Sequence, residues 1–306
     1  MSLLNRISLR MQRDYCRWQY QRVAATIAST PVVQRGQLPF TLLSMVHTRD
    51  VLSYLVALKS FVARANPQRI VMVCDPSITT ADREFLKVHV PHLELRHADE
   101  FVDPAIPRGG CWERLFAIAT LSPEDYVIQL DADTVTTADI PEVCEAIMAR
   151  RGFVLGEETE QSLLTFEQSS RNARGRLGPN PHIQTLSEAA LIDTGLPATK
   201  LYVRGCAGFT GFPSSTDMRA AMLDFSGRMA AQLGSERWAS WGTEQVTSNY
   251  LVANANATQV LPFPKYGTPD VRTDDTAFLH FIGSMRFINR TYELTSLAAI
   301  TALQRK

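Results

Sequence analysis

The chain has 306 residues, 45% of them hydrophobic and 20% charged, which is typical of a folded protein with room for one large domain. Its 31 basic and 31 acidic side chains cancel, and this balance argues against a partner made of nucleic acid. The five cysteines are widely spaced without a C-x-x-C pair, so we expect reduced thiols and a cytoplasmic protein. No run of eighteen apolar residues and no signal-peptide pattern occurs, so no membrane span or secretion is expected.

The first segment, residues 1–38, is predicted to be an amphipathic helix followed by a linker. Apolar side chains recur at helical spacing, and arginines fall mostly on other faces. The apolar positions are Leu4, Ile7, Met11, Tyr15 and Trp18, and the arginines are Arg6, Arg10, Arg13, Arg17 and Arg22. Two interpretations stay open. The apolar stripe packs on the rest of the chain, or the helix attaches the protein to an anionic membrane surface, to a partner or to a second copy.

Strands and helices alternate in the second segment, residues 39–306. Continuous apolar runs predict buried strands, and apolar repeats every three to four residues predict helices. We expect strands over 40–46, 69–74, 93–96, 126–130 and 277–281, and helices over 50–65, 79–88, 110–120, 139–150, 215–233, 242–253 and 292–304. This order predicts an α/β fold with a mostly parallel central sheet flanked by helices.

Two stretches break this rhythm. Residues 156–199 show no clear periodicity and are rich in Gly, Pro, Ser and Asn, which predicts a binding loop or lid that selects the second substrate. Residues 205–211 carry three glycines and predict a tight turn, or a close approach of the backbone to a ligand.

The most informative segment is a predicted strand that ends in Asp131-Ala132-Asp133. Ligands of open α/β sheets bind at the carboxyl ends of the strands. Two carboxylates one residue apart can both bind one hard cation. The alternative is a solvated turn, or Asp133 capping the next segment. Common fingerprints of dinucleotide-binding proteins, P-loop proteins, serine hydrolases and zincins are absent.

A strand ending in D-x-D within an α/β chain of this size resembles the metal-binding motif of GT-A-fold glycosyltransferases. The resemblance implies a Rossmann-like GT-A fold, a nucleotide-sugar donor and Mn²⁺ or Mg²⁺. The stretch His280-Phe-Ile-Gly283-Ser-Met-Arg286 is similar to the H-F-x-G-x-x-K motif of the retaining family that includes glycogenin and lipopolysaccharide galactosyltransferases. It implies His280 as a metal ligand beside Asp131 and Asp133, and Arg286 in place of the phosphate-binding lysine, a swap that suits the guanidinium fork.

Further site residues follow from the same resemblance. The residues expected to contact the donor are His47, Thr48, Arg49, Asp75, Arg114, Ala132, Gly283 and Arg286. Glu244 and Gln245 are similar to an acidic-Gln helix start that faces the sugar and the acceptor, and with Arg286 they are the expected catalytic residues. The alternative for Glu244 is that its charge only complements the dipole at the start of a helix. The alternative for Arg114 is a charge on a helix surface.

The resemblance implies a metal-dependent glycosyltransferase of the hexosyltransferase class that moves a sugar, from UDP most readily, to an acceptor hydroxyl with retention. A cation and Arg286 would neutralise the departing diphosphate. The alternatives are a sugar nucleotidyltransferase, which needs a Gly-rich basic loop after the first strand, and a non-catalytic nucleotide-sugar-binding protein. The sugar stays open, and so does the acceptor, whether glycan, lipid or protein.

Overall fold

The computed structural model describes residues 3–305, which centre on a seven-stranded sheet. In spatial order its strands are β10 (Gln259–Val260), β6 (Phe153–Leu155), β9 (Cys206–Phe212), β4 (Val127–Leu130), β1 (Leu38–Val46), β2 (Pro67–Cys74) and β3 (Glu94–His97). Neighbouring strands run parallel except β9, which is antiparallel to both β4 and β6. The predicted α/β fold with a mostly parallel sheet is confirmed.

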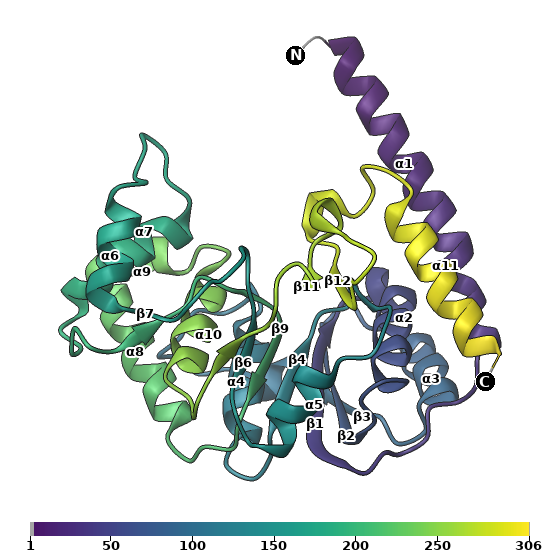
Figure 1. Cartoon of the computed structure of the whole chain (residues 1–306), viewed down its shortest axis with the longest axis horizontal. Helices are drawn as coiled ribbons and strands as arrows, with labels where there is room; N and C mark the ends of the chain where they lie inside the picture. The colour runs from purple at the N-terminus through teal and green to yellow at the C-terminus, as the bar shows by residue number, and fades with distance from the viewer. Residues whose placement is uncertain (1–2, 306) are drawn as a thin grey trace.

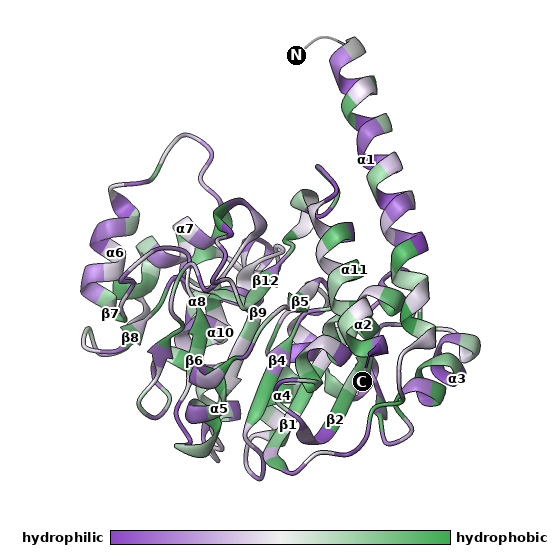
Figure 2. Cartoon of the chain, turned by 45° about the vertical axis from the view of Figure 1, so that its right-hand side comes forward, coloured by the Kyte–Doolittle hydropathy of each residue, from purple (hydrophilic) through white to green (hydrophobic). Residues whose placement is uncertain are grey.

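Helices cover both faces of this sheet (Figure 1). They are α1 (Leu3–Ala25), α2 (Val51–Val62), α3 (Thr80–His89), α4 (Trp112–Leu121), α5 (Pro141–Met148), α6 (Phe166–Arg174), α7 (Ile183–Ala190), α8 (Met218–Leu233), α9 (Ser235–Trp238), α10 (Thr243–Ala253) and α11 (Thr291–Gln304). Alternate residues of a strand enter different cores, as the pleat requires. In β1, Leu42 joins the core under α2 and α11, and Leu43 joins the core under α4 and α10. Figure 2 shows the apolar strands at the centre of the molecule.

A small second sheet brings the two predicted metal-binding motifs together. It has the order β11 (Tyr266–Gly267), β12 (Phe278–His280) and β5 (Thr134–Thr136). The register pairs His280 with Thr134, the residue directly after Asp133. The last predicted strand therefore exists, but it lies beside the D-x-D turn and outside the central sheet. A two-stranded sheet of β7 (Leu164–Thr165) and β8 (Leu201–Tyr202) completes the strands of the described residues.

The prediction of a turn over residues 205–211 is wrong, because the structure places the buried strand β9 there. Glycine is rare inside strands, and here it serves close packing. A Cβ on Gly208 would lie 2.1 Å from Cε1 of His280, and a Cβ on Gly211 would lie 2.2 Å from Cε1 of Phe153. The glycines therefore make room for two neighbouring rings.

Residues 156–199 are not an irregular loop, since they contain α6, α7 and the short η4 (Leu191–Thr194). Their buried faces are largely polar, which hides the helical period from a search for apolar repeats. In α7 the buried side chains include Gln184, Ser187 and Glu188. The start of α6 is a capping box between Thr165 and Gln168.

Helix α1 packs on the molecule through a different face from the predicted one. Its buried residues, Cys16, Tyr20 and Ala24, lie against α11 and α2, while the predicted stripe is exposed from Ile7 to Trp18. Figure 1 shows α1 running beside α11 and extending beyond it. No helix within residues 3–305 has the length and apolar content needed to cross a bilayer. Residues 1, 2 and 306 and the side chain of Leu4 lie outside the described part.

Candidate metal and donor site

A cavity of about 850 Å³ opens at the carboxyl ends of β1, β2 and β4. Loops after these strands form one wall, and the starts of α7 and α10 form the opposite wall. All predicted site residues except Thr48 line it: His47, Arg49, Asp75, Arg114, Asp131, Ala132, Asp133, Glu244, Gln245, His280, Gly283 and Arg286. The structure therefore brings together segments that are up to about 240 residues apart in the chain, as expected for this edge of an open α/β sheet.

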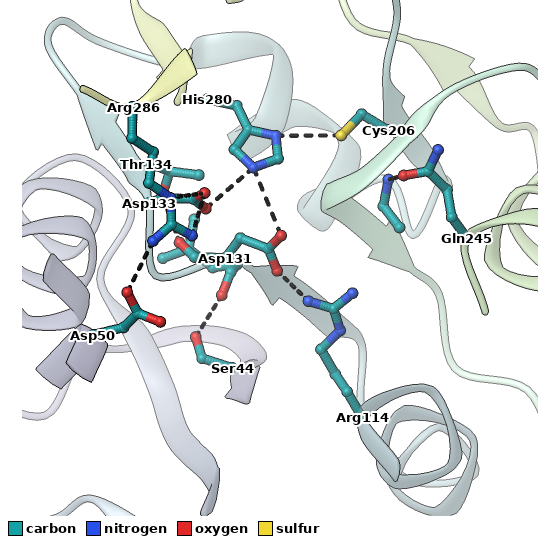
Figure 3. A network of polar contacts seen from close by, with 12 residues as sticks. Ser44, Asp50, Arg114, Asp131, Asp133, Thr134, Cys206, Gln245, His280 and Arg286 are labelled. Carbon is teal, nitrogen blue, oxygen red and sulfur yellow. Dashed lines mark hydrogen bonds and ion pairs between the residues drawn. The ribbon is translucent and has the colours of Figure 1, made fainter. Parts of the chain in front are cut away.

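Asp131, Asp133 and His280 converge between the two walls (Figure 3). Nε2 of His280 lies 3.2 Å from Oδ1 of Asp133 and 3.6 Å from Oδ2 of Asp131. One ligand atom from each of the three residues lies within 4.8 Å of the other two. Nε2 of His280 thus faces both carboxylates, and the three ligand atoms are close enough together to bind one metal ion.

The donor set and its surroundings fit a divalent cation. Two carboxylates and one imidazole suit Mn²⁺. They suit Mg²⁺ less well, because Mg²⁺ prefers oxygen ligands. Backbone contacts fix Asp131, since the Thr134 hydroxyl donates to its carbonyl over 2.9 Å and its amide donates to the Gly208 carbonyl over 2.8 Å. Gly208 also leaves space for the His280 ring, as no larger residue would. The structure thus supplies three candidate ligands, together with hydrogen bonds and space that hold them in position.

The second ring nitrogen of His280 also has a neighbour. Nδ1 lies 3.2 Å from Sγ of Cys206, the first residue of β9. A contact to the second nitrogen fixes the ring orientation in many metal sites. Sequence reasoning missed Cys206, because a lone cysteine in a glycine-rich stretch carries no signal of its own.

Arg286 closes the site on one side. Its Nε donates to Oδ2 of Asp133 over 2.7 Å, and its Nη1 donates to Oδ1 of Asp50 over 2.8 Å. Asp50 stands at the start of α2 and its side chain is only 15% exposed. It was not among the predicted site residues, because its contact with Arg286 joins segments 236 residues apart in the chain. Asp50 therefore holds the guanidinium beside the carboxylate pair.

These contacts set the charge states of the site. Burial alone would raise the pKa of Asp133, but His280 and Arg286 outweigh it and lower that pKa. Burial would lower the pKa of His280, yet the neighbouring Cys206 and Asp133 raise it well above its usual value. The charged forms of both are therefore stabilised, and Nε2 of His280 would bind a cation only after losing its proton.

Arg114 links the carboxylate pair to α10. It is buried, pairs with Asp131 through one nitrogen and donates to Oε1 of Glu244 through Nη2 over 3.1 Å. One guanidinium thus serves two carboxylates. Burial raises the pKa of Glu244 to about 7, against the lowering effect of Arg114. Arg114 is therefore part of the site, and not a surface helix charge.

The wall formed by β1 and β2 carries the residues predicted to hold the nucleotide. Nδ1 of His47 accepts from the Arg49 amide over 3.3 Å, and its Nε2 lies 3.8 Å from Oδ1 of Asp75. Thr48 is the exception, because its hydroxyl donates to Asp82 over 2.8 Å and it does not line the cavity. The Thr48 side chain thus fixes the loop to α3, and its role in holding the nucleotide stays a prediction.

The opposite wall presents amides and an aromatic ring. Gln245 donates to Oε1 of Gln184 over 3.2 Å, and its own Oε1 accepts from the Ala207 amide over 3.4 Å. His182 and Gln184, at the start of α7, line the cavity, as does Trp241, which is 72% exposed. The predicted Gln245 is thus a bridge between α7 and β9. Gln184 was not predicted, since a buried polar helix face gives no apolar period, and the exposed His182 and Trp241 precede α7 and α10 without a motif of their own.

The topology and the site together define a class: an α/β fold of the GT-A type, with a D-x-D turn at the carboxyl edge of its sheet. Solved glycosyltransferases share this fold. At 12% identity the bifunctional glycosyltransferase WbbM, in its apo form, has a TM-score of 0.50 over 83% of this chain and 47% of that chain. An active-site mutant of the galactosyltransferase LgtC has a TM-score of 0.51 at 12% identity, over 85% of this chain and 95% of that chain.

Mouse xyloside xylosyltransferase 1, in its apo form, has a TM-score of 0.45 at 14% identity, over 81% of this chain and 98% of that chain. The chain spans about half the length of the WbbM chain that it matches. No protein-family model matches the sequence, and no curated protein matches it. The likeness to WbbM and LgtC concerns the fold.

Proposed function

We propose that the protein is a metal-dependent glycosyltransferase that moves a sugar from a nucleotide-sugar donor to an acceptor hydroxyl. The observation that carries this proposal is the convergence of Asp131, Asp133 and His280 with Arg286 at the carboxyl edge of a GT-A-type sheet. Carboxylates from one motif and an imidazole from another would hold Mn²⁺ or Mg²⁺. Such a cation, when bound, supplies positive charge that stabilises the leaving diphosphate.

The chain's own residues then have distinct roles. Arg286 lines the cavity between Asp50 and Asp133, so a diphosphate bound beside these residues would meet its guanidinium. Arg114 keeps the Asp131 carboxylate oriented, because it is buried in α4 and is also paired with Glu244 of α10. His47, Arg49 and Asp75 form the wall that would hold the nucleoside.

We assign the acceptor to the opposite wall. His182, Gln184 and Trp241 there offer hydrogen-bonding groups and an exposed ring beside Glu244 and Gln245. Residues 156–199 therefore remain the proposed acceptor region, and the start of α7 is the part of this region that lines the cavity. The carrier is UDP, the sugar is a hexose and the transfer retains configuration, in line with the H-F-x-G spacing around His280.

The discriminating assay is hydrolysis of nucleotide sugars, in which water replaces the unknown acceptor. The full chain with Mn²⁺ is incubated with a panel of UDP- and GDP-sugars, and release of the nucleoside diphosphate is followed by mass spectrometry. We expect one UDP-hexose to be cleaved and Asp133→Ala to reduce the rate at least about 100-fold. The matched control is Asp139→Ala, which removes a carboxylate that is 85% exposed outside the cavity.

Two results would contradict the proposal. The first is cleavage by Asp133→Ala at the rate of the control. The second is a panel in which every sugar stays intact although UDP binds, which would identify a non-catalytic binding protein. Retention is read separately from the anomeric configuration of the product by NMR.

A further inference from the structure

Helix α1 has one face that the molecule uses. Tyr20 is 3% exposed and stacks on Tyr292 of α11 with ring centroids 4.0 Å apart. Cys16 and Ala24 are buried on the same side of the helix. With about 3.6 residues per turn, these positions four apart form one continuous stripe. This stripe accounts for the attachment of the C-terminal half of α1.

A second apolar stripe of α1 faces away from the molecule. Its residues are Ile7, Met11, Tyr15 and Trp18, which are 47%, 68%, 52% and 50% exposed. Their spacing of three and four residues places them on one side of the helix, roughly half a turn from Tyr20. Every residue from 5 to 15 is exposed. An apolar stripe that includes two aromatic rings and lies opposite the packed face has no role in the fold.

A row of arginines runs along another side of α1, nearer to the side of Tyr20 than to the exposed stripe, and Cζ of Arg17 in this row lies 5.3 Å from the ring centroid of Phe287. Arg6, Arg10, Arg13 and Arg17 follow each other at intervals of three and four, and Figure 2 shows the alternation of hydrophilic and hydrophobic positions along α1. A fifth guanidinium, that of Arg22, lies 4.8 Å from the ring centroid of Trp18. The helix holds five arginines and one acidic residue, so the rest of the chain carries 26 basic and 30 acidic groups. The positive charge is thus concentrated on α1.

We propose that this exposed face of α1 docks on the surface of an anionic lipid bilayer. Ile7, Met11, Tyr15 and Trp18 would enter the interface between headgroups and acyl chains, and the arginine row would meet the lipid phosphates. Such a surface suits a helix with apolar and aromatic side chains on one face and arginines on its other faces, because long arginine side chains can extend to the phosphates. The negative remainder of the chain is repelled by anionic lipid, so α1 is the point of contact.

Charge also argues against a second copy of the chain as the occupant. Two α1 helices packed through this stripe would bring together two elements that each carry five arginines and one acidic residue, and this like net charge disfavours such a pair. The inference is independent of the proposed catalytic function, because α1 does not line the cavity. It is consistent with the predicted division into residues 1–38 and 39–306, which stays a proposal.

The test is co-sedimentation of the full chain with vesicles. We expect binding to phosphatidylcholine vesicles that contain about one third phosphatidylserine, weaker binding at high salt, and little binding to pure phosphatidylcholine. The variant Met11→Asp/Trp18→Asp should weaken binding at least about tenfold, and so should Arg6→Glu/Arg10→Glu/Arg13→Glu. Melting temperatures should not change, since these side chains are exposed.

The control is Met148→Asp at the end of α5, where the methionine is 66% exposed, compared with 68% for Met11. It should bind vesicles like the wild type. The proposal is overturned if the wild type does not sediment, if it binds both kinds of vesicle equally, or if Met11→Asp/Trp18→Asp binds unchanged. It is also overturned if ultracentrifugation without lipid shows a dimer that this variant loses, because the stripe would then join two copies.

Discussion

Arg286 shares its guanidinium between Asp133 and Asp50, and this sharing defines its role at the scale of single residues. The resembled motif has lysine at this position, and either cation can neutralise a phosphate. We therefore expect Arg286→Lys to bind UDP with Mn²⁺ within about tenfold of the wild type. Arg286→Met should bind about 10–100-fold more weakly, as expected for a lost charge-assisted hydrogen bond. Equal affinities of the wild type and Arg286→Met in calorimetry would remove Arg286 from the donor site.

Glu244 gives the site a pH-dependent stability. Burial raises its pKa in the folded chain to about 7, while the unfolded chain keeps the ordinary value. A raised folded pKa stabilises the fold below the unfolded pKa, and this contribution is lost as the pH rises to about 7. We expect the free energy of unfolding of the wild type to fall by about 3 kcal/mol relative to Glu244→Gln between pH 4.5 and 7.5. Urea titrations that give both proteins the same pH dependence would contradict this assignment.

Gly208 is a residue of β9 whose missing side chain leaves room for the His280 ring. A methyl group there would lie 2.1 Å from Cε1 of His280, so the ring must move away from the aspartates. We expect Gly208→Ala to weaken Mn²⁺ binding about 10–100-fold, measured by electron paramagnetic resonance. The control is Gly227→Ala in α8, where a Cβ meets no atom within 4 Å. Unchanged Mn²⁺ affinity in Gly208→Ala would exclude His280 as a ligand held by this contact.

At the scale of elements, α1 and α11 are joined by aromatic packing. The ring of Tyr20 stacks on Tyr292 and lies 5.6 Å from that of Phe287, which follows Arg286 in the chain. We expect Tyr20→Ala to lower the free energy of unfolding by about 3 kcal/mol. Tyr15→Ala, at an exposed position of the same helix, should change it by less than about 0.5 kcal/mol. Equal effects of the two substitutions in chemical denaturation would contradict this packing.

The elements also show what the sequence could predict. Long apolar runs such as β1 and β2 are recognisable because both faces are buried in apolar cores. The glycines of β9 predict a turn when the sequence is considered alone. In the structure they make room for rings from distant segments. α7 was missed because its buried face is polar. Local pattern therefore predicted the elements that pack by apolar burial alone.

The residues of the candidate site also divide into those that could be predicted from the sequence and those that could not. Asp131, Asp133 and His280 could be predicted, because each stands at the end of a recognisable strand within a motif. Asp50 and Cys206 could not, since their roles depend on contacts between segments more than 70 residues apart. The register of β12 with β5, which places His280 beside Asp133, is likewise a property of the fold and not of either motif.

At the scale of the whole molecule, a net charge of zero hides an uneven distribution. Positive charge lies on α1, and the remainder is acidic, with its carboxylates partly gathered at the cavity. Arg114 and Arg286, the arginines next to Asp131 and Asp133, are already paired with these carboxylates. A diphosphate alone would meet Asp131 and Asp133 directly, so its binding should depend on a divalent cation between them.

The most direct test of the central claim is calorimetric titration of UDP into the full chain with Mn²⁺ and, separately, with EDTA. We predict binding with Mn²⁺, a loss of at least about tenfold with EDTA, and the same loss in Asp133→Asn with Mn²⁺ present. UDP and GDP that give no binding with Mn²⁺, or that bind equally well with EDTA, would contradict a metal-dependent nucleotide-sugar site.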